Sequence, residues 1–215
     1  MDWHVVIANM DLLLQGLKNT LHITIAVTII GVIAGMALCV MRRATSRWLA
    51  AAAKAYIAFF RITPELALIF WAYFCLPPLF GLMLSGWLSG TLALGLVAAA
   101  YFAEIYRAGI ESIARGQWEA GEALGLNRSA VWIKVVLPQA LRRMIPALVN
   151  YLTEIIKNST LLAGVGVAEM AYQAYTLGAQ TFRYVELLSS IAMLFFIIIF
   201  PISLYSRRIE RKMVR

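Results

Sequence analysis

The chain has 215 residues, of which 62% are hydrophobic and 14% are charged, and its mean hydropathy is +0.78. Soluble globular domains average about 45–50% apolar and about 25% charged residues, so this composition excludes an ordinary soluble domain and indicates a membrane protein. The net charge of +8 does not indicate nucleic-acid binding, because the basic residues flank apolar segments and no aromatic-rich basic segment offers a stacking surface.

Long apolar blocks predict helices that cross a membrane. No Lys, Arg, Asp or Glu occurs in the blocks Asn19–Met41, Leu66–Ala103 and Leu187–Ser206. A helix needs about 20 apolar residues to span a hydrocarbon core of about 30 Å. We therefore predict an all-α, polytopic membrane protein that forms a single transmembrane domain over residues 1–215. Its five predicted spans are Leu13–Val40, Tyr56–Leu76, Trp87–Ala103, Met144–Val165 and Leu187–Tyr205.

The second predicted span carries a break signal near its start. Thr63-Pro64-Glu65 has the composition of a helix start, with Thr as N-cap, Pro at the first helical position and an acid in the first turn. The span is therefore predicted to consist of two helical pieces joined at Arg61–Pro64. We expect Arg61 to reach the cytoplasmic interface. For Glu65, helix capping is the favoured interpretation, and selection against anionic substrates is the alternative.

The distribution of Lys and Arg orients the predicted spans. Four basic residues lie in Arg42–Lys54, six in Glu104–Arg143 and five in Arg207–Arg215, whereas the opposite side carries only Arg183. Cytoplasmic loops are enriched in Lys and Arg. The N-terminus is therefore predicted to be outside, and the long middle loop and the C-terminal tail are predicted to be cytoplasmic.

The loop Glu104–Arg143 is predicted to contain two short helices, Gly116–Leu124 and Arg128–Val136. Gly125 is placed to end the first helix in a left-handed conformation, and Asn127 is placed to cap the second. Pro138 is expected to interrupt the chain before it re-enters the membrane.

The first helix of this loop is expected to present an apolar side formed by Trp118, Ala120 and Leu124, with Glu119 and Glu122 pointing elsewhere. Small residues at its centre would let the surface of another protein approach the backbone. A competing interpretation is a helix that only rests on lipid headgroups. The two glutamates and the small apolar side weaken that interpretation, because anionic headgroups favour basic faces.

Glu154 and Lys157 lie three residues apart, on one face of the fourth predicted span. Ionised side chains within a membrane are costly, so by default they face protein or water and indicate function. In one interpretation this face lines a translocation path, whose further members are Asn158, Ser159 and Thr160. In the other interpretation, Glu154 and Lys157 neutralise each other as an ion pair that only holds helices together.

These segments together resemble a known family. Glu119-Ala120-Gly121 is followed by three residues, Gly125, nine residues and Val135-Val136-Leu137-Pro138. This spacing is similar to the EAA signature of ABC importer membrane subunits. Gln117-Trp118-Glu119 and Leu137–Arg143 narrow the resemblance to permeases of the polar amino acid uptake family. Four further segments agree with it, namely Arg61–Pro64, Tyr101–Ile110, Lys157–Leu161 and Gly166–Glu169.

The sequence departs from the family pattern at several positions. The family usually has Ala where Gly121 stands, Gly where Ile62 stands and Asp where Asn158 stands. These departures do not remove the resemblance to a transporter, but the substrate cannot be carried over from the family.

The resemblance implies the transmembrane fold of type I ABC importers in a bacterial inner membrane, with a second permease subunit, identical or related. It implies that an external solute-binding protein delivers an amino acid and that a cytoplasmic ABC ATPase dimer, which binds ATP and Mg²⁺, grips a coupling helix in the loop. This chain would then hold no cofactor and catalyse no reaction. The implied ATPase-coupling residues are Trp118, Glu119, Ala120, Gly121, Gly125 and Pro138. The expected substrate path contains Arg61, Thr63, Glu65, Glu154, Lys157, Asn158, Ser159 and Thr160.

Two other function classes compete with this one. The sequence contains no Gly-x-x-x-x-Gly-Lys-Ser/Thr phosphate loop, so ATP-derived energy would have to come from another subunit. The main alternative is an ion-coupled secondary transporter or channel that uses Glu154, Lys157 and His22, although His22 is better explained as a packing residue. A membrane-embedded enzyme is a third hypothesis, which the absent catalytic motifs disfavour.

Overall fold

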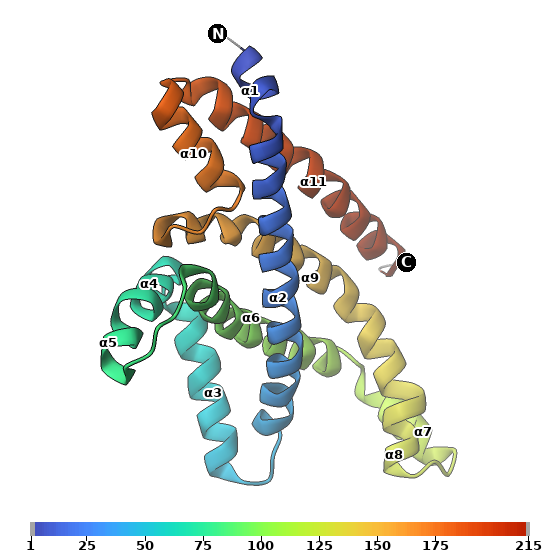
Figure 1. Cartoon of the computed structure of the whole chain (residues 1–215). Coiled ribbons are helices and arrows are strands. Elements are labelled where there is room, and N and C mark those ends of the chain that lie inside the picture. The colour runs from blue at the N-terminus through green and yellow to red at the C-terminus, as the bar shows by residue number, and fades with distance from the viewer. Residues whose placement is uncertain (1–2, 214–215) are drawn as a thin grey trace.

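The computed structural model describes residues 3–213, and every regular element within them is helical (Figure 1). The first half contains α1 (His4–Ala8), α2 (Met10–Arg42), α3 (Arg47–Ile62), α4 (Glu65–Phe70), α5 (Leu76–Phe80) and α6 (Gly86–Glu111). The second half contains α7 (Arg115–Ala123), α8 (Arg128–Val131), α9 (Leu137–Asn158), α10 (Met170–Thr181) and α11 (Tyr184–Met213). The short turns are the π-helical η1 (Trp71–Cys75) and η2 (Trp132–Val136) and the 3₁₀-helical η3 (Ser159–Val165). The all-α fold class is thus confirmed.

Helices α2 and α6 pack directly against each other at the centre of the molecule. A β-carbon on Gly31 or on Gly35 would lie 2.7 Å from a side-chain atom of Phe102. In a membrane, helices associate through close packing at small residues because lipid removes the hydrophobic driving force between them. The two glycines therefore set how closely the backbone of α2 approaches α6.

The predicted break in the second span is present. Helices α3 and α4 meet at a bend of 104°. The cap differs from the prediction, because α4 begins at Glu65 with Pro64 as its N-cap, and the Thr63 hydroxyl donates to the Phe59 carbonyl at 2.8 Å. Thr63 is held in an extended conformation, as expected for the residue before a proline. Its side chain therefore ends α3 and does not start α4.

Beyond the predicted end of the second span at Leu76, the helical path continues through η1 and α5 to Phe80. Pro77 and Pro78 lie at the start of α5, where the missing N–H group of proline is tolerated. The path ends at Gly81, whose φ of +64° is the left-handed conformation that glycine adopts readily.

Helices α2, α6 and α11 are each long and apolar enough to cross a membrane, and the bent unit from α3 to α5 is a fourth candidate among the described residues. The predicted spans Leu13–Val40, Trp87–Ala103 and Leu187–Tyr205 lie within α2, α6 and α11. The predicted span Met144–Val165 instead covers part of α9 and all of η3. Helix α9 is not among the candidate membrane spans, because it carries charged side chains toward both ends. By length and composition, the described residues therefore contain fewer candidate spans than the five predicted.

Helix α10 was not predicted, and it packs on the first turns of α2. A β-carbon on Gly16 would lie 2.8 Å from the Met170 Cα, and the Asn19 side chain donates to the Ala168 carbonyl at 2.7 Å. Glu169 is fully buried and caps α10 by accepting hydrogen bonds from two backbone N–H groups. The Gly166–Glu169 segment thus joins α10 to α2.

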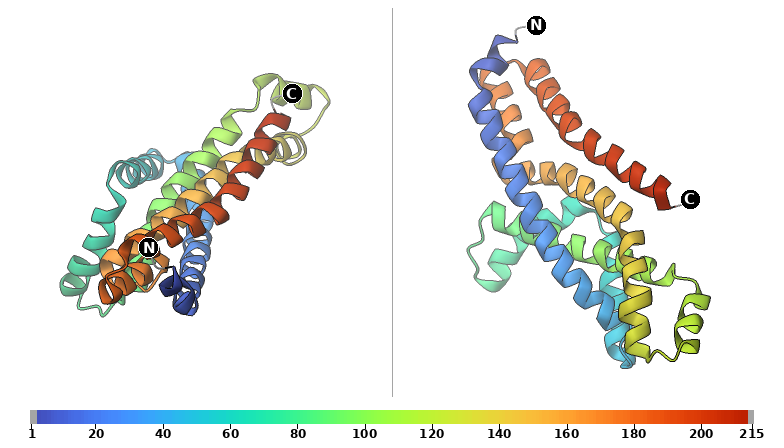
Figure 2. Two further views of the ribbon diagram at one scale, coloured as in Figure 1. Left: turned by 90° about the horizontal axis from the view of Figure 1, so that it is seen from above. Right: turned by 90° about the vertical axis from the view of Figure 1, so that its right-hand side faces the viewer.

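The helices separate the molecule into two ends (Figures 1 and 2). The N-terminus and the turn between α10 and α11 lie at one end, and the connector from α2 to α3 lies at the other together with α7 and α8. The basic segments Arg42–Lys54 and Glu104–Arg143 therefore share one end of the fold.

Candidate functional site

Helices α7 and α8 form a small hairpin that follows α6, and two contacts hold it closed. The ring of Trp118 lies 5.6 Å from that of Trp132, centroid to centroid, at an angle of 30°. Gly121 is buried, and a β-carbon there would lie 2.9 Å from Val131 Cγ2. Trp118 and Gly121 are three residues apart and therefore face the same way. The inner face of α7 is thus used within this chain.

The outer face of α7 differs from the prediction. Trp118 does not share a side with Ala120 and Leu124, because those two residues are exposed, Leu124 at 81%. Glu119 also lies on the exposed surface, where it forms an ion pair with Arg115 at 3.0 Å. The surface available to another molecule therefore combines a small residue, one aliphatic side chain and a charged pair.

The turn between α7 and α8 has the predicted caps. Gly125 has a φ of +75°, and the N–H of Leu126 donates to the Gly121 carbonyl at 3.2 Å, which closes the end of α7. The Asn127 side chain accepts from the Ala130 N–H at 2.9 Å and so caps α8. The hairpin is therefore fixed by local backbone chemistry as well as by packing.

Pro138 does not interrupt the chain as predicted. Helix α8 continues through η2 into α9 without a break, and Pro138 lies at the beginning of α9. A proline clashes with the carbonyl four residues before it and offers no N–H group to the helix. The wider π-turn at Trp132–Val136 absorbs this misfit, as such turns commonly do within helices. The hairpin is therefore joined to α9 by a continuous helix.

One side-chain contact connects the hairpin to α9, and a second connects α9 to α6. Gln139 of α9 donates to the Gln117 side chain at 3.1 Å and to the Val135 carbonyl at 2.9 Å. Arg143 donates to the carbonyl of Ser112 at the end of α6. A displacement of α7 would therefore be transmitted to α9 through the Gln117–Gln139 bond, and from α9 to α6 through the Arg143–Ser112 bond.

Glu104 of α6 is the centre of an ion-pair cluster that the sequence analysis did not identify. Its carboxylate lies 2.9 Å from Arg42 of α2 and 3.9 Å from Arg61 of α3, and it also pairs with Arg107. Arg61 additionally lies over the Tyr101 ring, 5.4 Å from its centroid. The sequence predicts that Arg61 reaches the cytoplasmic interface. In the structure Arg61 lies at the C-terminal end of α3, which is remote from the α2–α3 connector, and there it contacts α6. In the sequence, Arg42 and Glu104 each stand at the edge of an apolar block, but nothing there pairs them with each other.

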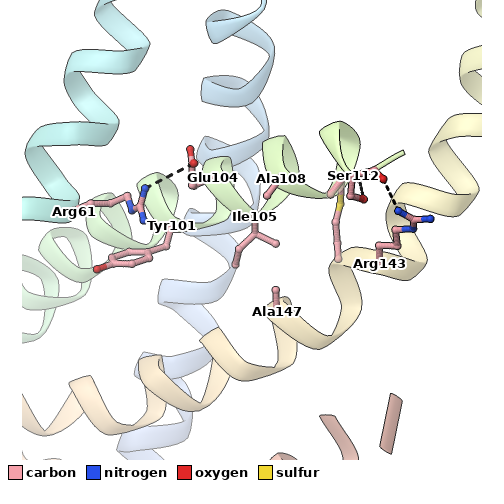
Figure 3. A pocket seen from close by; sticks show the side chains of 10 residues that line it. Arg61, Tyr101, Glu104, Ile105, Ala108, Ser112, Arg143 and Ala147 are labelled. Atoms are coloured by element: carbon pink, nitrogen blue, oxygen red, sulfur yellow. Dashed lines mark hydrogen bonds and ion pairs between the residues drawn. The ribbon is translucent and has the colours of Figure 1, made fainter. Parts of the chain in front are cut away.

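A cavity of about 350 Å³ lies between α6 and α9, beside this cluster (Figure 3). Arg61 and Glu104 flank one end of it, and Arg143 with Ser112 flanks the other. The middle is apolar, with Ile105 and other aliphatic side chains. The cavity therefore offers charged groups at both ends and an uncharged wall between them.

Glu65 and Asn158 are brought together by the fold. They line one recess with Tyr151, between α4, α9 and the apolar sides of α2 and α6, and the side chains fill it, leaving a free volume of about 0 Å³. Glu65 also lies close enough to Glu154 for the two carboxylates to interact. These polar side chains therefore come from different helices and converge on one place.

Lys157 and Thr160 face elsewhere. Both line a crevice of about 470 Å³ against α11. Lys157 pairs with Glu154 at 2.6 Å, and both side chains are about half exposed. The hydroxyl of Thr160 donates to the Lys157 carbonyl and that of the fully buried Ser159 to the Ile156 carbonyl, so both hydroxyls are bonded within their own helical segment. The residues expected to line one path therefore lie on two sides of α9.

Comparison with known proteins identifies a family. Residues 27–215 match the model of the binding-protein-dependent transport system inner membrane component. The chain is 38% identical over 192 residues to the probable amino-acid ABC transporter permease protein y4tG of Sinorhizobium fredii, covering 89% of this chain and 83% of that one. It is 33% identical over 213 residues to the arginine transport system permease protein ArtQ of Bacillus subtilis, covering 99% and 97%.

Solved structures support the fold. A crystal structure of an amino acid ABC transporter with histidines contains a chain that superposes with a TM-score of 0.92 at 30% identity, covering 99% of each chain. A chain of the inward-facing MetNI methionine ABC transporter superposes with a TM-score of 0.77 at 23% identity, covering 97% of this chain and 99% of that one.

Proposed function

This chain belongs to the family of binding-protein-dependent transport system inner membrane components, and on that premise we propose that it is the permease subunit of an ATP-driven importer for a polar amino acid. The family assignment confirms the resemblance seen in the sequence, and it makes the chain a multi-pass protein of the inner membrane. The amino acid class is supported by the names of relatives that cover almost the whole chain, one an arginine and others glutamine permeases.

A transport system of this family works with a binding protein, and an ABC system hydrolyses ATP on a separate subunit. We propose that the ATPase, carrying ATP and Mg²⁺, docks on the outer face of α7. The observation that carries this proposal is the geometry of the hairpin. Trp118 and Gly121 hold it closed from within, while Glu119, Ala120 and Leu124 remain on its surface.

The continuous path from α8 through η2 into α9 supports a mechanical role for the hairpin. The Gln117–Gln139 bond joins α7 to α9, and the Arg143–Ser112 contact joins α9 to the end of α6. Closure of a docked ATPase dimer would therefore move α6 and α9 as rigid bodies, which is how helices are commonly shifted in transporters. Trp118, Gly121, Gly125 and Pro138 would then act by shaping the hairpin, and Glu119 and Ala120 by touching the ATPase.

For the substrate path, Glu65 and Asn158 have the best support, because these polar side chains from two helices converge within an apolar surround, and the recess that they line is closed in this conformation. Arg61 and Thr63 lie at the end of α3, directly before α4, and Glu154 lies beside Glu65. We propose that the ammonium group of the substrate is recognised near Glu65. Lys157 and Thr160 would line a separate crevice toward α11.

The proposed orientation places the N-terminus outside and the end with α7 and α8 in the cytoplasm. The shared position of the basic segments Arg42–Lys54 and Glu104–Arg143 at one end of the fold supports it. A second permease subunit, identical or related, would cover the exposed apolar side chains of α11, among which Phe196, Ile197 and Phe200 are 47–58% exposed.

The full chain, co-expressed with its ATPase and binding protein and reconstituted into liposomes, tests this function. We expect uptake of a polar amino acid that requires ATP inside the liposomes and the binding protein outside, with ATP hydrolysis stimulated by the same amino acid. Uptake that proceeds without the ATPase and stops when an ion gradient is collapsed would support the ion-coupled transporter and refute the proposal. His22 lies on the exposed side of α2.

A further inference from the structure

A second cavity, of about 470 Å³, opens where the last turns of α2 meet the α7–α8 hairpin. It has no part in the substrate path proposed above, since none of the path residues lines it. Its wall combines two arginines, two tryptophans and several aliphatic side chains, including Arg43, Arg128, Trp118, Trp132, Met36 and Val40. The lining of the cavity therefore brings basic and aromatic side chains together with apolar ones.

The two arginines of this cavity carry charge that no acidic side chain offsets among the described residues. The guanidinium of Arg43 lies over the Trp132 ring, 5.6 Å from its centroid, and neither Arg43 nor Arg128 forms an ion pair there. The adjacent Arg42 shows the contrast, because it is bound to Glu104 at 2.9 Å. The cavity is therefore suited to bind an anion.

An exposed apolar stripe on α2 leads directly to this cavity. Its residues recur every three or four positions and are 41–67% exposed, namely Leu21, Ile25, Ile29, Ile33, Met36 and Val40. From Leu21 to Val40 the stripe is about 30 Å long at 1.5 Å per residue, which matches the thickness of a hydrocarbon core. Arg43 follows one turn after its end, where the headgroup region would begin if the stripe spans the hydrocarbon core.

We propose that Arg43 and Arg128 bind the phosphate of an anionic phospholipid from the leaflet on the hairpin side, with its acyl chains lying along the α2 stripe. Basic pockets between spanning helices are known to hold anionic headgroups, and tryptophans favour the membrane–water interface. Because Trp118 and Trp132 also close the hairpin, the bound lipid links the bilayer to the element that we propose docks the ATPase.

The test uses the full chain purified with its partner subunits in a neutral detergent. Phosphatidylglycerol, phosphatidylcholine and inorganic phosphate are titrated separately, and the melting temperature is followed at each concentration. We expect phosphatidylglycerol to raise the melting temperature at much lower concentration than phosphatidylcholine, and inorganic phosphate to have no effect. R43Q and R128Q should each raise the phosphatidylglycerol concentration for half-maximal stabilisation about fivefold, since one basic residue near an anionic headgroup contributes about 1 kcal/mol.

Lys54→Gln is the matched control, because Lys54 is an exposed cation of the same basic segment and does not line the cavity. It should leave the titration unchanged. Equal stabilisation by phosphatidylcholine, or an unchanged titration in the R43Q/R128Q double variant, would overturn the proposal. Stabilisation by inorganic phosphate alone would show that the cavity binds a free anion. A change in subunit stoichiometry caused by R43Q would show that a second protein chain covers the cavity. Either outcome would also refute the lipid assignment.

Discussion

Gly121 faces Val131 across the α7–α8 hairpin so closely that a β-carbon on the glycine would lie 2.9 Å from Val131 Cγ2. The sequence had suggested that small residues in α7 make room for another protein. At Gly121 the room is taken by this chain's own α8, and Ala120 is the small residue left on the outer surface. The Glu-Ala-Gly signature therefore serves two purposes, with its last residue closing the hairpin and its first two facing outward.

Gly121→Ala should destabilise the hairpin. Alanine favours a helix over glycine by up to about 1 kcal/mol, but overpacking a buried site costs about 1–3 kcal/mol, and Val131 is both buried and stiff because it is branched at Cβ. We therefore expect a net loss of about 0–2 kcal/mol, measured by thermal unfolding of the purified chain. Gly116→Ala is the control, because no atom lies within 4 Å of a β-carbon there, and it should be neutral or stabilising.

A double-mutant cycle separates the two contributions. In a Val131→Ala background the clash is absent, so Gly121→Ala should lose its destabilising effect. A loss of the same size in both backgrounds would show that the contact with Val131 is not the cause.

Glu119→Lys should abolish ATP-dependent uptake while the chain remains inserted in the membrane. Glu119 is exposed and its ion pair with Arg115 is a surface pair, which contributes at most about 1 kcal/mol to stability. The expected effect is therefore on docking and not on folding, and we expect uptake to fall below a tenth of the parental rate. The measurement is uptake in liposomes together with co-purification of the ATPase.

Arg115→Gln provides the comparison, because it removes the same ion pair but leaves the carboxylate in place. It should keep most of the uptake and most of the bound ATPase. Parental uptake by the Glu119→Lys variant would count strongly against docking on this face of α7.

The features of this fold that could be predicted from the sequence are those decided by a few neighbouring residues. The cap at Asn127, the left-handed Gly125 and the break before Pro64 follow from local backbone chemistry, and each is present. Helix α10 was missed because it is short and mixes polar with apolar residues. The path of the chain through Pro138 was missed because a π-turn has no clear sequence signal.

The Glu104 cluster could not be predicted for a different reason. Its partners Arg42, Arg61 and Arg107 come from three helices, and 62 residues separate Arg42 from Glu104 in the chain. The pairing of these arginines with Glu104 depends on how α2 and α3 pack on α6. That packing is determined by buried side chains elsewhere in the helices. The same limit applies to Glu65 and Asn158, which the fold brings into one recess.

Glu104→Gln should destabilise the packing of α2, α3 and α6, because it leaves Arg42 and Arg61 without a carboxylate and leaves Arg107 with Glu111 alone. Breaking a buried ion pair by removing one partner costs about 3–5 kcal/mol, and the 22% exposure of the Glu104 side chain should reduce this to about 1–3 kcal/mol. Arg61→Gln should cost less, because Arg61 is 3.9 Å from the carboxylate and 41% exposed. Thermal unfolding of the two variants checks the order, and an equal or reversed order would contradict the cluster's geometry.

Exchanging the charges of Glu154 and Lys157 decides whether this pair only holds helices together. The two side chains meet at 2.6 Å, so each single neutralisation leaves one charge unpaired in or near the membrane, where such a charge costs about 2.5 kcal/mol or more at a helix centre. We expect E154Q and K157Q to lower the amount of inserted protein, measured by immunoblotting of membrane fractions. The exchange E154K/K157E restores the pair on the same face of α9, so insertion should recover.

Uptake should not recover in the exchanged variant. The exchange places a cation beside Glu65, where we propose that the substrate's ammonium group is recognised, and an anion in the crevice toward α11 that Arg207 also lines. Uptake by E154K/K157E should therefore stay below a tenth of the parental rate even at parental levels of inserted protein. Recovery of both insertion and uptake would assign the pair to helix packing alone and would leave Glu65 and Asn158 as the remaining candidates for the substrate path.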